Sequence, residues 1–77
     1  MQIDVFQLGR RIAAQRELRD MTQKALANAT GLTQATIARV ERGQKKRVEL
    51  NTIAQIAHAL GVGLDDLLKP IEERDPV

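Results

Sequence analysis

The sequence has no cysteine, no tryptophan and no tyrosine, and Phe6 is its one aromatic residue. Without cysteine, neither a disulfide nor a thiolate metal site can hold the fold together. A core must therefore be built from aliphatic side chains, which are available because 43% of the residues are hydrophobic. A chain without cysteine is compatible with the cytoplasm, which is the location we expect.

Long apolar runs are missing as well. No stretch approaches the roughly 20 apolar residues of a membrane-spanning helix. The opening MQIDVFQLG is too short and too polar for an export signal, and we expect no membrane partner. The length of 77 residues suits one small domain. We expect this domain over residues 1–70, followed by a short, acidic, frayed tail over residues 71–77.

Residues for catalysis are scarce. His58 is the one histidine, and Ala54 and Val62 occupy the positions where a second metal ligand would share its helix face. Asp65 and Asp66 are adjacent, but they lie near a predicted helix start, where acidic residues suit the helix dipole. No nucleophile is paired with a base. We expect no enzyme, no metal and no cofactor.

Apolar residues recur at spacings of three and four, which predicts helices, and no stretch alternates as a strand does. The pattern predicts an all-α fold with five helices over residues 5–18, 23–30, 34–42, 50–60 and 64–68. Asp4 suits the N-cap of the first helix. The residues expected to face inward are Val5, Leu8, Ile12, Leu26, Ala29, Ile37, Val40, Ile53, Ile56, Ala57 and Leu60.

The segment TQKALANATGLTQATIARVERG, residues 22–43, opens two predicted helices with the same dipeptide. A threonine can cap a helix by accepting a backbone N–H, and such helix starts bind phosphate well. Gly31 and Gly43 suit the left-handed position that ends each helix. Two phosphate-binding helix starts about one helix apart indicate a helix-turn-helix that straddles a DNA backbone.

Charge is segregated along the chain. Residues 19–47 carry seven basic and two acidic groups, whereas residues 48–77 carry two basic and six acidic ones. The basic part coincides with the predicted helix-turn-helix, as an electrostatic footprint for nucleic acid should. The alternative is an ordinary solvated face.

Two charged residues occupy inward positions. Arg16 follows Ile12 by four residues, and Glu41 follows Ile37 by four. A lone buried charge is very costly, so we expect these two side chains to meet between the first and third helices. The alternative is that each reaches water from the edge of its apolar stripe.

Three stretches resemble the Cro/cI-type helix-turn-helix family, also called the XRE family, of phage and bacterial repressors. They are LGRRIAAQR (8–16), MTQKALANATGLTQATIARVERG (21–43) and TIAQIAHALGVGLDDLL (52–68). The resemblance implies a compact five-helix lambda-repressor-like domain of bacterial or phage origin. It also implies a buried ion pair between Arg16 and Glu41, and a third helix that enters the major groove.

The chain departs from the family pattern at three places. Ala25 stands where the family often has an acidic residue, so the second helix lacks a capping box. Asp20 stands where glycine is common. The segment 44–49 is one residue longer than usual and lacks its typical proline.

The outward positions of the third helix carry side chains that can read bases. Glutamine pairs with adenine, arginine with guanine, and a methyl group touches the thymine methyl. The expected base contacts are Gln34, Ala35, Thr36 and Arg39. The alternative for Gln34 and Arg39 is a bond to phosphate. The expected phosphate contacts are Thr22, Gln23, Thr33, Arg42, Gly43, Lys45, Lys46 and Arg47, with a mobile solvated loop as the alternative for the last three.

We interpret the chain as a sequence-specific regulator of transcription, a repressor that binds a near-palindromic double-stranded operator as a homodimer. Apolar residues in the acidic C-terminal third form the expected dimer patch, namely Val62, Leu64, Leu67 and Ile71. The alternative is ordinary core, which is the default for Leu67 and Phe6. Other functions that fit are an antitoxin that autoregulates its operon while holding a toxin, a controller of a restriction-modification operon, and a protein-interaction module that has lost DNA binding.

Overall fold

The computed structural model describes residues 3–68, so the predicted tail over 71–77, Ile71 included, lies outside the described residues. The described part contains five helices and no strand. The helices are α1 (Val5–Leu18), α2 (Gln23–Thr30), α3 (Gln34–Glu41), α4 (Leu50–Leu60) and α5 (Leu64–Leu68). The predicted all-α fold is confirmed, and one boundary is wrong: α3 ends at Glu41, with Arg42 as its C-cap.

The helix ends follow the capping chemistry of the sequence. Asp4 accepts hydrogen bonds from the backbone N–H groups of Phe6, at 2.9 Å, and Gln7, at 3.1 Å. Thr22 and Thr33 cap α2 and α3 in the same way. Each cap satisfies N–H groups that the first turn of a helix leaves without a partner, which is worth about 1 kcal/mol.

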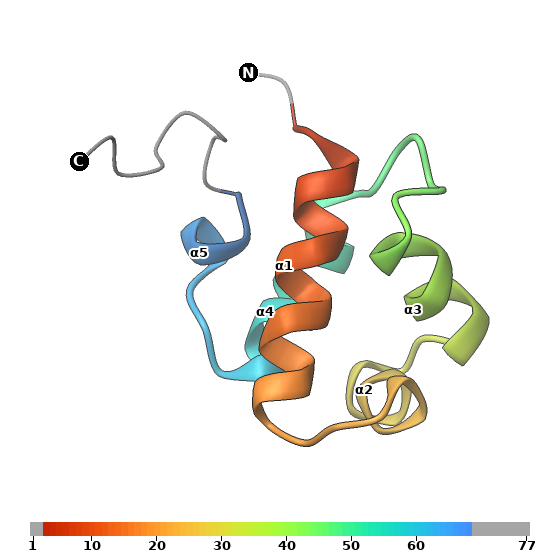
Figure 1. The fold of residues 1–77 in the computed structure, drawn as a ribbon, viewed down its shortest axis with the longest axis vertical. Helices are drawn as coiled ribbons and strands as arrows, with labels where there is room; N and C mark the ends of the chain where they lie inside the picture. The colour runs from red at the N-terminus through yellow and green to blue at the C-terminus, as the bar shows by residue number, and fades with distance from the viewer. Residues whose placement is uncertain (1–2, 69–77) are drawn as a thin grey trace.

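The helices pack around α1, which runs through the centre of the molecule (Figure 1). The pair α2 and α3 lies on one side of α1 and α5 on the other (Figure 1). Contacts join α2 to α3, α1 to α3, and α4 to each of α1, α2 and α5. The helix-turn-helix pair is therefore supported from behind by α1 and α4.

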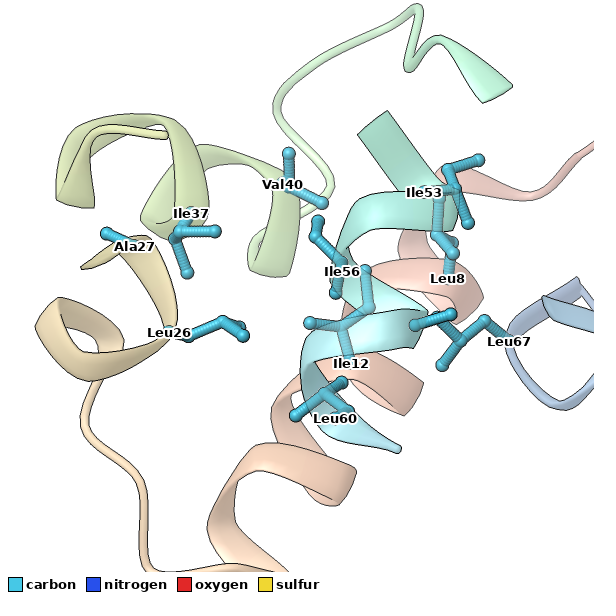
Figure 2. Packing of buried hydrophobic residues seen from close by; sticks show 11 residues of the cluster. Leu8, Ile12, Leu26, Ala27, Ile37, Val40, Ile53, Ile56, Leu60 and Leu67 are labelled. Atoms are coloured by element: carbon cyan, nitrogen blue, oxygen red, sulfur yellow. The ribbon is translucent and has the colours of Figure 1, made fainter. Parts of the chain in front are cut away.

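The core is aliphatic, as the near absence of aromatic residues predicted. Figure 2 shows side chains from α1 to α4 meeting in one cluster, with Leu67 entering from α5. The buried hydrophobic residues are Leu8, Ile12, Leu26, Ala27, Ile37, Val40, Ile53, Ile56, Ala57, Leu60 and Leu67. Two predictions are wrong. Ala27 is buried and Ala29 is exposed, since Leu26 and Ala27 form the buried face of α2, which contacts α3 and α4. Phe6 is 63% exposed instead of belonging to the core.

Gly9 allows α1 and α3 to approach closely. A Cβ atom at this position would lie 2.8 Å from the Glu41 carbonyl carbon and would also meet the Val40 carbonyl oxygen. Backbone cannot retreat as a flexible side chain can, so a larger residue would push the two helices apart. This role of Gly9 could not be predicted, since a glycine inside a helical pattern has no periodic signature.

Residues 3–68 contain neither a membrane-spanning helix nor a cluster of metal ligands. No helix there has the length and apolar character needed to cross a membrane. No cluster of three or more histidine, cysteine, aspartate or glutamate side chains there could hold a metal ion.

Candidate nucleic-acid interface

Helix α3 has one buried and one exposed face. Ile37 and Val40 are 0% and 1% exposed, and they fix the helix against the core. Gln34, Ala35 and Arg39 are exposed, so they project away from the body of the protein. An amide, a methyl group and a guanidinium thus lie on one rigid surface, and groups of these kinds recognise the edges of bases in the major groove.

The start of α3 is held by two threonines. The Thr36 backbone N–H donates to Thr33 Oγ1 at 3.1 Å, and Thr33 Oγ1 donates to Thr36 Oγ1 at 2.9 Å. Thr33 therefore uses its single hydroxyl proton on Thr36, which is half-buried. Gln34, next along the chain, is exposed, and its side chain has no hydrogen-bond partner among residues 3–68.

The start of α2 has the same two residues in a different arrangement. The Ala25 backbone N–H donates to Thr22 Oγ1 at 2.9 Å, so Thr22 is the cap. Gln23 Nε2 donates to Glu41 Oε1 at 3.0 Å. The amide that was predicted to bind a phosphate thus donates one of its two N–H groups to a carboxylate at the end of α3.

Arg16 and Glu41 meet, as the sequence predicted. Arg16 Nε lies 2.6 Å from Glu41 Oε2, and Arg16 Nη2 donates to Glu41 Oε1 at 3.1 Å. The side chains are only 12% and 6% exposed. This two-point geometry is the strong form of a charged hydrogen bond. The hydrogen bond to Glu41 raises the pKa of Arg16, so the guanidinium stays charged throughout the working pH range.

Arg16 also fixes the turn between α1 and α2. Its Nη1 donates to the Met21 carbonyl oxygen at 2.8 Å, and its own carbonyl oxygen accepts from the Met21 N–H at 3.1 Å. Asp20, just before Met21, has a left-handed backbone with φ of 54°. Aspartate tolerates this conformation less well than glycine does, which explains why the family often has glycine here.

The segment after α3 carries the densest positive charge of the described chain. Arg42, Lys46 and Arg47 are exposed, and Lys45 is half-buried. This segment lies on the same side of the molecule as α2 and α3 (Figure 1). The three predicted phosphate-binding elements, the two helix starts and the basic segment, therefore lie on one side of α1 (Figure 1).

Gly43 has the left-handed backbone that was predicted to end the helix, and its N–H is bonded within the protein. Its N–H donates to the Val40 carbonyl oxygen at 3.1 Å, so the structure uses on the helix end the donor that the prediction assigned to a phosphate. Its φ of 70° is left-handed, and a Cβ atom would lie 2.7 Å from Phe6 Cδ1. Gly43 therefore ends α3 and gives room to the Phe6 ring.

The predicted dimer patch is smaller in the structure. Leu67 is 1% exposed and belongs to the core, so its assignment to an interface is wrong. Val62 and Leu64 are half-buried and pack partly on the core. The exposed large hydrophobic residues of the described chain are Ile3, Phe6, Leu18 and Leu50.

The sequence profile of a helix-turn-helix family, HTH_3, matches residues 12–67, which contain the whole pair α2 and α3. The chain belongs to the HTH_3 helix-turn-helix family. The predicted relationship to the XRE-type helix-turn-helix proteins is therefore confirmed. The family match and the transcription regulators among the similar structures support the predicted DNA-binding regulator of transcription.

Solved structures share the fold. The restriction-modification controller protein C.AhdI from Aeromonas hydrophila is 33% identical, with a TM-score of 0.79 over 83% of this chain and 96% of that one. The hypothetical transcription factor NHTF from Neisseria is 28% identical, with a TM-score of 0.84 over 96% of this chain and 90% of that one.

An enzyme is also similar, but over a part of its length. Hydroxypropylphosphonic acid epoxidase from S. wedmorenis is 28% identical, with a TM-score of 0.80 over 91% of this chain and 37% of that one. The likeness therefore concerns one part of a larger protein and carries no argument about its reaction. No curated protein matches the sequence.

Proposed function

We propose that the chain is a sequence-specific repressor that binds a near-palindromic operator as a homodimer, with α3 in the major groove. The observation that carries the proposal is the two-sided character of α3. Ile37 and Val40 anchor one face in the core, and Gln34, Ala35 and Arg39 stand exposed on the other. The exposed polar side chains of such a rigid helix have no partner within the described protein, so they can form hydrogen bonds with base edges in place of water.

Each exposed side chain of α3 suits a particular base. Arg39 can donate to O6 and N7 of guanine, and Gln34 can pair with N6 and N7 of adenine. Ala35 offers a methyl group to thymine. Thr36 is half-buried and its hydroxyl already accepts from Thr33, so its contribution is a fixed methyl group and one remaining proton.

Affinity comes from the groups around α3. Residues 19–47 carry seven basic and two acidic groups, and Lys46 and Arg47 are exposed. Each phosphate neutralised by a cation releases counterions, so binding weakens as salt is raised. Thr22 adds a neutral donor, because its hydroxyl proton has no acceptor among the described residues.

A dimer supplies the rest of the affinity, because one small module buries too little surface for tight specific binding. We place the contact on the acidic C-terminal third, at Val62 and Leu64, since the basic side repels its own copy. We expect Leu64→Glu to abolish cooperative binding, because a two-fold contact receives each substitution twice. Leu18→Glu, at a leucine that is 75% exposed on α1, is the matched control and should leave assembly unchanged.

The function is tested by selecting bound duplexes from a random pool and measuring the affinity of the winner at several salt concentrations. We expect two half-sites about 34 Å apart, and binding that is lost when about five base pairs are inserted between them. Binding to every duplex alike, or tolerance of the insertion by a protein that sediments as a monomer on DNA, would contradict the proposal.

A second function has a specific observation behind it. The controller C.AhdI is matched over 96% of its own length at 33% identity. We therefore infer that control of a restriction-modification operon is the variant to test first. It requires the selected duplex to match DNA upstream of a neighbouring endonuclease gene. A selected duplex that lies only upstream of unrelated genes would rule this variant out while leaving DNA regulation intact.

A further inference from the structure

The side chain of Gln23 joins two helices instead of facing outward. Its Nε2 donates to Glu41 Oε1 at 3.0 Å. Gln23 is the first residue of α2 and Glu41 the last residue of α3. The contact therefore links the start of one helix to the far end of the next, across 18 positions of sequence.

The carboxylate of Glu41 is the centre of this arrangement. Its Oε2 faces Arg16 Nε, and its Oε1 accepts from both Arg16 Nη2 and Gln23 Nε2. The Glu41 side chain is 6% exposed, so water cannot replace a lost donor easily. Gln23 is the one donor from α2 that this carboxylate has among the described residues.

The geometry of the helix pair explains why this bond matters. Gly31, Leu32 and Thr33 form the connection between the end of α2 and the start of α3. At the other end of the pair, the polar connection is the one through Gln23 and Glu41. Between the two ends, apolar contacts such as Leu26 against Ile37 set the distance, but apolar contacts are not directional. A hydrogen bond to a fixed carboxylate is directional, and so it can set the angle between the helices.

We propose that Gln23 is a positioning residue, which fixes the angle of the recognition helix by holding the start of α2 on Glu41. The part of this proposal that concerns DNA rests on the proposed function. The part that concerns the helix pair does not, because it can be measured on the free protein.

The free protein offers a matched control, because Gln34 is the first residue of α3 just as Gln23 is of α2. An acidic residue at a helix start is favourable, so Gln34→Glu should raise the melting temperature slightly. Gln23→Glu gains the same benefit but places a second carboxylate on Glu41, so it should lower the melting temperature by several degrees. Equal shifts for the two variants would overturn the proposal.

Gln→Met variants add no charge, and they decide the question if Gln23→Glu fails to fold. Methionine keeps the length of glutamine without its amide. Gln23→Met should melt roughly 4–8 °C below the wild type, whereas Gln34→Met should melt within about a degree of it. Indistinguishable melting temperatures for the two methionine variants would overturn the positioning role.

DNA binding separates positioning from phosphate contact. The probes are the duplex selected by the wild type and a random-sequence duplex. Gln23→Met should lose roughly tenfold in its preference for the selected duplex while keeping its affinity for the random one. Thr22→Ala, which removes a neighbouring phosphate donor, should weaken both alike.

The opposite outcome for Gln23→Met, equal weakening of both duplexes at an unchanged melting temperature, would make Gln23 a phosphate ligand and overturn the proposal. If the wild type binds neither duplex, the proposed function fails, and with it the DNA half of this proposal. The melting temperatures of the glutamate and methionine pairs still decide whether Gln23 holds the helix pair.

Discussion

The two Thr-Gln helix starts are identical in sequence and differ in use. At the start of α2, Thr22 keeps a proton for an outside acceptor and Gln23 is bound to Glu41. At the start of α3, Thr33 donates to Thr36 and Gln34 is exposed without a partner. The glutamine is structural in the first case and available in the second, and the threonines have the reverse roles.

The difference comes from what lies opposite each start. The start of α2 faces the end of α3, where Glu41 supplies a buried acceptor held by Arg16. The start of α3 faces solvent, so its glutamine has no acceptor and its cap turns to the next hydroxyl instead. The Thr-Gln dipeptide therefore has different roles at the two helix starts. The groups that lie opposite it decide whether the threonine or the glutamine is available to bind DNA.

The largest expected effect comes from removing Glu41, the acceptor that Gln23 binds at the start of α2. Glu41→Ala removes the buried carboxylate that Arg16 and Gln23 share, and it leaves Arg16 with the Met21 carbonyl oxygen and the exposed Glu17 carboxylate, 3.7 Å away. Stranding one member of a buried pair typically costs about 3–5 kcal/mol. Thermal unfolding should show this loss, whereas Glu49→Ala should melt close to the wild type, since Glu49 is exposed and makes no capping hydrogen bond. Equal melting temperatures for Glu41→Ala and Glu49→Ala would show that the buried acceptor at Glu41 does not stabilise the fold.

The start of α3 is tested through substitutions on α3 and in the basic segment that follows it. Arg39→Ala should relax preference at one base position, at a cost of about 1–3 kcal/mol in binding to the selected duplex. Lys46→Ala, in the basic segment, should weaken all duplexes alike and lower the salt slope by about one. Anisotropy titrations with single-base variants of the duplex measure both effects. A changed base preference in Lys46→Ala but not in Arg39→Ala would reverse the roles.

The two threonine caps, Thr22 and Thr33, should differ in their effect on DNA binding. Thr22→Ala and Thr33→Ala each lose an N-cap, and each should cost about 1 kcal/mol in unfolding free energy. Their effects on DNA should differ. Thr33→Ala removes the hydroxyl that donates to Thr36 Oγ1, so the Thr36 hydroxyl can reorient and base preference should change. Thr22→Ala should not change base preference. Selections with the two variants compare their preferred sequences directly, and identical preferences in both variants would contradict the distinction.

The smallest expected effect is a gain. Asp20 has a φ of 54° in the turn that leads to the first start. Glycine adopts this conformation without strain, so Asp20→Gly should raise the unfolding free energy by up to about 1 kcal/mol. Denaturant unfolding measures this change, and a loss of stability would mean that the Asp20 side chain has a role that its geometry does not reveal.

Much of the fold could be predicted because local chemistry and periodicity agree along this chain. Threonine caps, glycine ends and apolar spacing gave the first and last residues of four helices, and α3 differed by one residue at its end. The inward positions of Arg16 and Glu41 predicted their contact, because two buried charges on neighbouring helices have few other solutions.

What could not be predicted depends on how the helices cross. The burial of Ala27 and the exposure of Phe6 follow from the rotation of each helix against its neighbours, which spacing does not give. The close approach at Gly9 depends on α3 lying across it. The binding of Gln23 to Glu41 could not be separated from phosphate binding, because both use the same amide and the acceptor lies 18 positions away.

The most direct test of the account follows the side-chain amide signals of both glutamines in one nitrogen–proton correlation spectrum, as the selected duplex is added to the protein. We expect the Gln34 signals to shift strongly with the selected duplex and much less with a random one, while the Gln23 signals stay near their free positions throughout. Large shifts for Gln23 with an unmoved Gln34 would show that the start of α2, and not the start of α3, contacts the DNA.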